Sequence, residues 1–361
     1  MAVAGTLFLD WMVFPEPVQL EVAARWLSCR HTRFRAGGHV RVAWAEISLE
    51  DAEITAPLIV SGHPPASGLA TRVGWLADPD DGDPERSFPP AMPSLVNVRR
   101  ADVAGLVVAD IDLGDCRFAG AHHLDQLQIA TADAFRRAPA CLGRGRQVLA
   151  EEAAWRAARG GRRARRWQQL AGETFRSPLL SLPPLSSGSE LLGVAQVGGQ
   201  EGRAALRARQ PGPGELAGIY RRLRKGREEA KNEPGAASFY YGECEMRRHA
   251  PTTPPVERWI LAGYWATSGY ALRAWRALAA LVVVIGLVGV GFSRVGFHHP
   301  HPSLTVSWLY ALQATVSLEG KARQLSGQLT LPGELLRVGL RLTGPVLLGL
   351  ALLSVRNRVK R

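Results

Sequence analysis

Apolar residues recur at every fifth position between residues 96 and 121, which is the most regular pattern in the chain. A second row of small or apolar residues lies two positions earlier, and the position between the two rows is mostly polar. A helix repeats every 3.6 residues and a strand every two, so neither element produces a spacing of five. A solenoid does, because each short unit turns a corner and points one side chain into a shared core. The predicted core residues are Val98, Val103, Val108, Leu113 and Phe118.

An earlier stretch repeats this spacing in another phase, with Trp44, Leu49, Ile54 and Ile59 as its central residues. Residues 61–95 separate the two stretches and are rich in Pro, Gly and Asp, which predicts an inserted loop that resets the register. We therefore predict a β-helical domain over residues 40–130, preceded by a cap region at 1–39. With four units to a coil, the recognisable units predict roughly two coils.

The pattern resembles the pentapeptide-repeat family, with Ala101-Asp102-Val103 and Cys116-Arg117-Phe118 at the matching positions. The resemblance implies a right-handed, four-sided β-helix. The segment Lys231–His249 is similar to a segment of membrane-associated pentapeptide-repeat proteins of actinobacteria. Some members of the family mimic duplex DNA and block topoisomerases, so an acidic solenoid with that role is one alternative.

After the solenoid the pattern becomes helical. Residues of high helix propensity predict a helix over Leu149–Arg159 and, after Pro234 and Gly235, another over Ala236–His249. The arginines and tryptophans of this part fit a nucleic acid, an anionic membrane surface or a solvated helix face. Three segments follow the solenoid in this prediction: a basic helical segment at 134–176, a flexible linker at 177–214, and a helical and interfacial segment at 215–272.

Two apolar stretches predict a transmembrane hairpin in residues 273–361. The first contains seventeen consecutive uncharged residues, Ala277–Ser293, close to the roughly 20 that cross a bilayer. The second is Leu335–Val355. Because cytoplasmic loops carry an excess of Lys and Arg, both termini are predicted to be cytoplasmic, in a plasma-membrane protein. The arginines predicted to face the membrane or its headgroups are Arg273, Arg276, Arg337, Arg341, Arg356 and Arg358.

Between the two spans, residues 304–318 predict a short apolar helix, which gives the layout of a two-span channel. The run that follows faintly resembles a potassium-channel filter, and its residues are Thr315, Val316, Ser317, Leu318, Glu319 and Gly320. Ser317 replaces a filter glycine and Leu318 a tyrosine, which argues against potassium selectivity. Two interpretations stay open: a closed hairpin with a helix on its outer surface, or a pore. A single hairpin cannot enclose a pore, so conduction would require a homo-oligomer.

Charge and hydropathy agree with this division into unlike parts. The 361 residues carry a net charge of +12 and a mean hydropathy of −0.04, which excludes a polytopic transporter but allows two spans. Trp44–Asp133 holds 15 acidic residues and 5 arginines, a net charge of −10, so the remainder carries +22. Because basic residues flank the predicted spans, they suit an anionic leaflet better than nucleic acid.

No nucleophile motif, P-loop, dinucleotide fingerprint or metal-ligand spacing is present, so we expect no enzyme activity, cofactor or metal. The cluster of His298, His299 and His301 is more typical of a turn than of a metal site. The sequence thus predicts an α+β multidomain membrane protein: a short β-helix, α-helices and a transmembrane hairpin. Its predicted partners are the lipid bilayer and an unidentified protein bound by the solenoid. The alternative function is an oligomeric, channel-like pore.

Overall fold

The computed structural model describes residues 6–62, 92–139, 145–159, 164–174, 210–298, 303–315 and 329–359. The chain divides into two compact units, Met1–Thr253 and Pro254–Arg361, called unit 1 and unit 2 below. Unit 1 contains strands followed by helices, whereas the described part of unit 2 is mainly helical.

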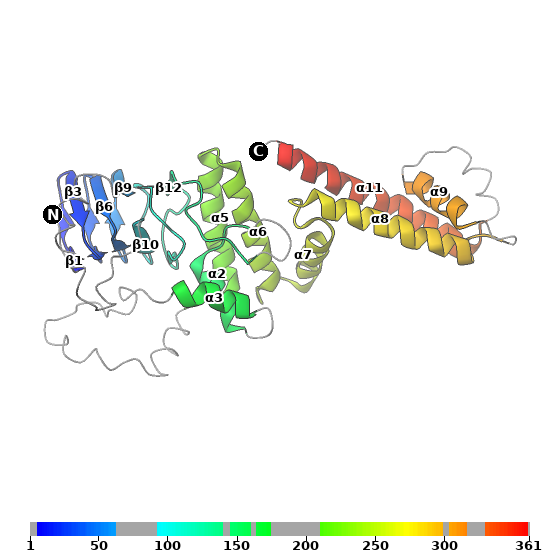
Figure 1. Cartoon of the computed structure of the whole chain (residues 1–361), viewed down its shortest axis with the longest axis horizontal. Helices are drawn as coiled ribbons and strands as arrows, with labels where there is room; N and C mark the ends of the chain where they lie inside the picture. The colour runs from blue at the N-terminus through cyan, green and yellow to red at the C-terminus, as the bar shows by residue number, and fades with distance from the viewer. Residues whose placement is uncertain are drawn as a thin grey trace, which may run out of the picture. The chain divides into compact units, whose positions relative to one another are not determined.

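Unit 1 begins with a parallel β-solenoid built from three sheets (Figure 1). The five-stranded sheet contains β3 (Val18–Ala23), β6 (Gly38–Ala43), β9 (Leu58–Gly62), β11 (Leu106–Ala109) and β12 (Gln128–Ile129). The four-stranded sheet contains β1 (Thr6–Phe8), β4 (Trp26–Ser28), β7 (Glu46–Ser48) and β10 (Ser94–Asn97). The three-stranded sheet contains β2 (Val13–Phe14), β5 (Arg33–Phe34) and β8 (Glu53–Ile54). Each coil gives one strand to the five-stranded sheet, so the solenoid has about five turns.

The coils stack in register. Val18 pairs with Gly38 and Gly38 with Leu58, so strand partners lie 20 residues apart. Between the strands, each coil donates backbone hydrogen bonds to the next one. The N–H of Leu9 donates to the carbonyl of Ser28 at 2.8 Å, and the N–H of Cys29 to the carbonyl of Ser48 at 2.9 Å. Every inner coil therefore depends on the next coil to satisfy its backbone.

One corner of the solenoid has a left-handed residue in every coil. These residues are Trp11, His31, Asp51, Arg100 and Gly120, with φ between 53° and 74°. Such a φ is unfavourable for residues with a Cβ. Several of these residues contact the equivalent residue of the neighbouring coil. The rings of Trp11 and His31 stack with centroids 4.0 Å apart, and Nε of Arg100 donates to Asp51 at 2.7 Å.

The interior of the solenoid agrees only partly with the predicted spacing. The five predicted core residues, Val98 to Phe118, all have 0% exposure. In the earlier phase Leu49 and Ile54 are buried, but Trp44 and Ile59 are partly exposed, so the prediction is wrong for these two. The reason is the longer strands of the five-stranded sheet, which alternate every two residues and shift the phase. In β9, Leu58 and Val60 point inward on either side of Ile59.

The solenoid is also longer than the spacing predicts. Residues 6–39, predicted as a cap region, carry β1 to β5 and part of β6, and thus form coils of the same stack. Of the predicted insertion at 61–95, residues 61 and 62 belong to β9 and residues 94 and 95 to β10, so the loop prediction is wrong at both ends. Residues 63–91 lie outside the described residues. After it, β10 pairs with β7 and β11 with β9, so the chain continues the stack where it had stopped.

Among the described residues of unit 1, the last coil is followed by the helices α2 (Ala150–Ala158), α3 (Ala164–Thr174), α5 (Pro213–Glu229) and α6 (Glu233–His249). Figure 1 shows α5 and α6 at the β12 end of the solenoid. Tyr220 of α5 and Phe239 of α6 belong to the same apolar core as the coils. The Arg227 guanidinium donates to the carbonyl of Ile129 at 3.2 Å, which binds α5 to the last strand. The helices thus cap the solenoid, and most of the predicted linker at 177–214 lies outside the described residues, which resume at residue 210.

The two cap helices approach closely at Gly242. A Cβ on this residue would lie 2.6 Å from a ring carbon of Tyr220, so the helix interface has no room for a larger side chain. Gly218, on α5, has nothing within 4 Å of the same position. The Tyr220 ring therefore packs directly on the α6 backbone, where its hydroxyl is held in a fixed place.

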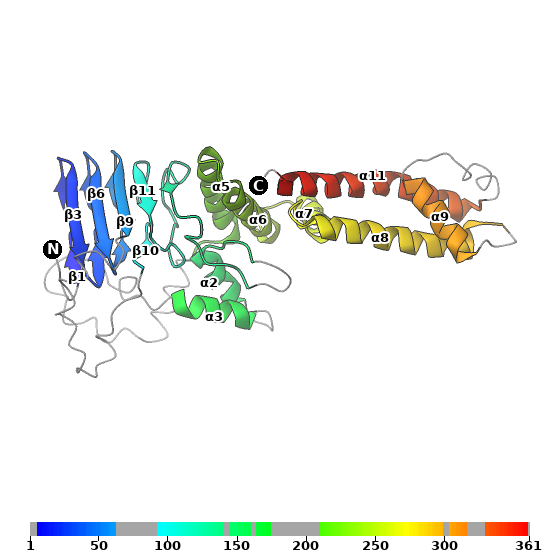
Figure 2. The ribbon, with the colours of Figure 1, turned by 45° about the horizontal axis from the view of Figure 1, so that its top comes forward.

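Unit 2 contains α7 (Pro255–Ser268), α8 (Ala274–Gly291), the π-helical turn η5 (Phe292–Gly296), α9 (Leu304–Thr315) and α11 (Leu331–Val359). Figure 2 shows α8 and α11 side by side, with α9 against them. Phe292, Tyr310 and Leu340 belong to a small core where the three helices meet. Close packing uses glycines: a Cβ on Gly289 would lie 2.3 Å from Trp308, and one on Gly344 would lie 2.6 Å from Thr315.

Candidate functional site

The first candidate site is the apolar surface of unit 2. The segments Trp275–Gly296 and Leu331–Arg356 have the length and composition to cross a membrane, and they correspond to the two predicted spans. In their most apolar windows only 11% and 28% of the residues are buried. A core helix of a soluble protein would be mostly buried instead. The exposed large apolar residues on α8 and α11 are Trp275, Leu278, Val282, Val283, Leu287, Leu331, Leu335, Val338, Leu342, Val346, Leu348, Leu352, Leu353 and Val355.

The predicted membrane-facing arginines lie in different surroundings. Arg273 precedes α8 and is partly buried, and the guanidinium of Arg276 lies 4.9 Å from the centroid of the Trp265 ring. Arg337 forms an ion pair with Glu334, with an N–O distance of 3.6 Å. Arg341 and Arg356 are exposed, and Arg358 belongs to the last turn of α11.

The filter-like run is described only at its first residue. Thr315 ends α9, is buried, and donates its hydroxyl to the carbonyl of Ala311 at 2.8 Å. Val316, Ser317, Leu318, Glu319 and Gly320 lie outside the described residues. Within one chain, α9 packs on α8 and α11 through Trp308 and Thr315.

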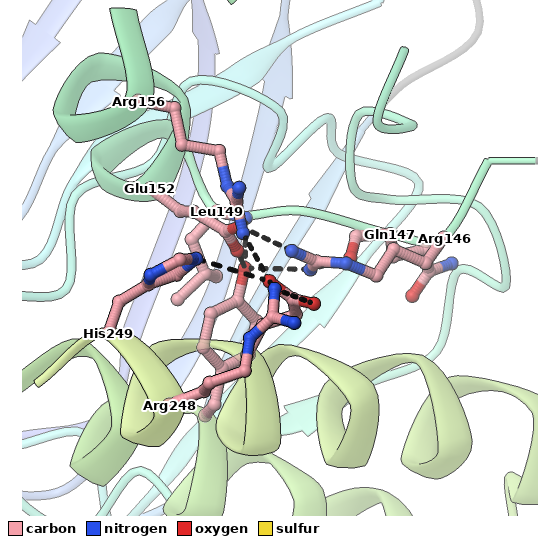
Figure 3. A network of polar contacts seen from close by, with 9 residues as sticks. Arg146, Gln147, Leu149, Glu152, Arg156, Arg248 and His249 are labelled. Carbon is pink, nitrogen blue, oxygen red and sulfur yellow. Dashed lines mark hydrogen bonds and ion pairs between the residues drawn. The ribbon is translucent and has the colours of Figure 1, made fainter. Parts of the chain in front are cut away.

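The second candidate site is a polar network where the solenoid meets its helical cap (Figure 3). The carboxylate of Glu152, at 0% exposure, accepts from Arg146, from Nε of Arg156 at 2.6 Å and from the hydroxyl of Tyr220. The same hydroxyl accepts from the N–H of Leu149 at 3.0 Å. Arg156 also donates to Glu245 at 3.1 Å. One network thus joins the segment after the last coil to α2, α5 and α6.

The charges in this network compensate one another. Burial alone would raise the pKa of Glu152, but the nearby Arg146 and Arg156 outweigh it and hold the pKa below the usual range. Glu245 is also buried, yet His249, Arg248 and Arg156 lower its pKa to about 2. Both carboxylates are therefore ionised at neutral pH and engaged by cations, which suits a structural network better than proton transfer.

Glu243 of α6 is a further acidic residue of the helical cap. In the structure its carboxylate is buried and forms ion pairs with Arg221 at 2.9 Å and with Arg224 at 3.2 Å. The partners lie on α5, the neighbouring helix, whereas Glu245 pairs within α6 through Arg248 and His249 as well as with α2. These contacts bind the cap helices to each other.

The last coil ends on a buried carboxylate. The N–H groups of Leu9, Cys29, Leu49 and Val98 each donate to a carbonyl of the next coil. Phe118 occupies the same position in the last coil, and its N–H donates instead to Oε1 of Glu151 at 2.8 Å. The N–H of Ala119 donates to the same oxygen at 2.8 Å. The Glu151 carboxylate thus takes the place of the backbone carbonyls that a further coil would supply. Burial of this carboxylate raises the pKa of Glu151 to about 7.

The sequence pattern predicts the helix at Leu149–Arg159 but indicates no role for its two carboxylates, Glu151 and Glu152. The available signal was weak: two adjacent acidic residues begin a helix that is otherwise rich in alanine. The N–H groups that Glu151 accepts from lie 33 and 32 residues earlier in the chain, and the Tyr220 hydroxyl bound by Glu152 lies 68 residues later.

Within the described ranges no group of three His, Cys, Asp or Glu residues is placed to hold a metal ion. His298 is exposed, and His299 and His301 lie outside those ranges. No protein-family model, no curated protein and no solved structure matches this chain.

Proposed function

We propose that this chain is a non-enzymatic integral membrane protein whose pentapeptide-repeat-like solenoid is a cytoplasmic scaffold for protein interaction. The observation that carries the proposal is the exposure of apolar side chains along both α8 and α11. Leaving so many large apolar side chains in water would cost about 1.5–3 kcal/mol each. A bilayer removes that cost, because its hydrocarbon core is an apolar solvent for such residues.

The distribution of arginines supports the orientation. Arg273 and Arg276 precede the first span, and Arg356 and Arg358 follow the second. Under the positive-inside rule both ends of the hairpin then face the cytoplasm, as does unit 1. The aromatic side chains of α7 and Trp275 suit the interface at the same side, where tryptophan and tyrosine are enriched.

The scaffold role is supported by the first coil of the solenoid. Among the described residues of unit 1 the exposed large apolar side chains are Phe8, Trp11, Met12, Val13 and Met92. Four of these five lie within one stretch of the first coil, whose strands β1, β2 and β3 are edge strands. An exposed apolar patch on strand edges is typical of a surface that pairs with another chain.

Membrane extraction tests the first half of the proposal. We expect the full chain to stay in the membrane pellet after alkaline extraction and to be released by detergent. The chain truncated to residues 1–253 should remain in the supernatant, because unit 1 has its own core. Release of the full chain at alkaline pH without detergent would overturn the proposal.

Photo-crosslinking in intact cells tests the scaffold. Val13 pairs with Arg33 and Arg33 with Glu53, so Val13 and Glu53 occupy equivalent, exposed positions in the first and third coils. A photoreactive residue at Val13 should give a discrete adduct with another protein, and one at Glu53 should not. Equal labelling at both positions, or none at Val13, would contradict a binding surface on the first coil.

A further inference from the structure

The two ends of the solenoid differ in how well their core is covered. In all three sheets the strand of the first coil, β1, β2 or β3, lies at an edge, and Figure 2 shows β3 at the outer end of its row. The inward-facing apolar residues of this coil are only partly buried, namely Leu7, Leu9, Phe14 and Leu20. Their equivalents one coil later are at most 4% exposed, namely Leu27, Cys29, Phe34 and Val40. The helices α5 and α6 cover the last coil, so among the described residues the first coil is the end without a cap, which a solenoid requires.

The outer edge of β3 also presents backbone groups. The N–H of Val18 donates to the carbonyl of Gly37 at 2.9 Å, so this residue points toward the second coil. Because backbone groups alternate in direction along a parallel strand, the N–H groups of Gln19 and Glu21 point away from β6. An edge of this kind pairs readily with one further strand.

The charges of the first three coils alternate in sign. The first coil (residues 6–23) carries three acidic residues and no basic one. The second coil (residues 26–43) carries four arginines and no acidic residue. The third coil (residues 46–62) carries four acidic residues and no basic one. Each coil is therefore complementary in charge to the next coil of the stack.

Ion pairs between neighbouring coils follow this alternation. Glu21 of the first coil pairs with Arg41 of the second, with an N–O distance of 3.1 Å. Arg33 of the second coil pairs with Glu53 of the third at 3.2 Å. Opposite charges on neighbouring strands stabilise their pairing, and like charges destabilise it. A strand added before the acidic first coil would therefore be favoured if its outward-facing residues were basic.

We propose that the protein partner of the first coil adds an extended strand to the outer edge of β3, and that this strand is apolar toward the core and basic toward solvent. The inference rests on the proposed function, in that a protein binds the first coil. The inward-facing apolar residues of such a strand would cover Leu20. An outward-facing Lys or Arg would lie beside Glu21, as Arg41 does on the other side of β3.

The charges disfavour two other occupants of this edge. A second copy of the chain would bring its own acidic first coil against this one. The inserted segment at 63–91 carries five acidic residues and two arginines, so it is acidic as well. Like charges on neighbouring strands oppose both arrangements.

Peptide binding to the purified full chain in detergent tests the charge of the strand. The probe is a fluorescent peptide that copies Arg33–Ala43, because β5 and β6 already pair with the first coil on its other side. We expect saturable binding that weakens about fivefold when Arg41 of the peptide is replaced by Glu, the order of an exposed cross-strand ion pair. Glu21→Lys in the protein should restore the binding of this altered peptide.

N-methylation of the same probe separates strand pairing from contact through side chains. The N–H of Gly38 donates to the carbonyl of Pro57, toward the following coil, so the N–H of Val40 points the same way and that of Arg41 the opposite way. A methyl group on the Val40 nitrogen should therefore abolish binding of the probe, and one on the Arg41 nitrogen should leave it within about twofold. No saturable binding, equal effects of the two methyl groups, or no dependence on charge would each overturn the proposal.

The crosslink at Val13 connects the inference to the partner in the cell. With the photoreactive residue there, Glu21→Lys should lower the yield of the adduct at least threefold. The control is Glu229→Lys, the same change of charge on an exposed residue of α5, which should not lower the yield.

The outcomes of this crosslinking separate the inference from the proposed function. An adduct that Glu21→Lys leaves undiminished would overturn the basic strand and keep the scaffold. An adduct at twice the mass of the chain would assign the edge to a second copy and overturn the proposal as well. Absence of any adduct would count against the scaffold itself, while the peptide still decides the chemistry of the edge.

Discussion

Replacing Glu152 by Gln should lower the free energy of unfolding of unit 1 by about 3–5 kcal/mol, because it removes the buried carboxylate that two partly buried arginines share. The Glu152 carboxylate has 0% exposure. It forms ion pairs with Arg146 and Arg156 and accepts a hydrogen bond from the Tyr220 hydroxyl. The amide of Gln has nearly the same shape but no charge, so the loss measures the electrostatic part of the network. The measurement is denaturant unfolding of residues 1–253, followed by circular dichroism.

Glu228→Gln is the matched control for this variant. Glu228 also pairs with an arginine four residues away, Arg224, at 3.0 Å, but on the exposed side of α5. Exposed pairs of this kind contribute about 0.3–0.5 kcal/mol, so the control should unfold almost as the wild type does. A loss below 1 kcal/mol for Glu152→Gln would show that the network does not hold the cap on the solenoid.

Replacing Glu151 by Ala should destabilise unit 1 at pH 5 by about 2–4 kcal/mol, because two buried N–H groups lose their acceptor. These are the N–H groups of Phe118 and Ala119, which complete the last coil. Glu151→Gln is the control, since its amide oxygen can accept both hydrogen bonds. At pH 5 the Gln variant should be close to the wild type in denaturant unfolding, and the Ala variant should not. Equal stability of the wild type, Glu151→Ala and Glu151→Gln would contradict a capping role for Glu151.

The same carboxylate predicts a pH dependence with a definite sign. Burial raises the pKa of Glu151 from 4.5 to about 7 in the folded state, so the folded state binds the proton more tightly than the unfolded state does. The associated stability is fully present below pH 4.5 and is lost as the pH rises through 7, a change of about 3 kcal/mol. Glu151→Gln cannot ionise and should lack this component. The difference between wild type and Glu151→Gln across pH 4.5–8 measures it.

A different part of the pH profile belongs to Glu245. Its pKa is lowered to about 2, so its contribution has the opposite sign: it is present above pH 4.5 and is lost as the pH falls toward 2. The two carboxylates therefore act in separate pH ranges. Glu151 also remains the only one of the two whose ionisation opposes folding near neutral pH.

The sequence by itself determined the elements whose pattern is local. The five-residue spacing of Val98 to Phe118 marks a solenoid because no helix or strand has that period. The uncharged runs of α8 and α11 mark candidate spans by length alone. The five-residue spacing does not mark the first two coils, because the longer strands β3 and β6 alternate every two residues, which is also the pattern of an ordinary sheet.

Only the tertiary structure decided which side chains act together. Glu151 lies 33 residues after Phe118, and Glu152 lies 68 residues before Tyr220, so no spacing in the sequence connects them. Periodicity fixes which way a side chain points along its own element. Its partners and its depth depend on which elements pack against it, and that is decided by the whole chain.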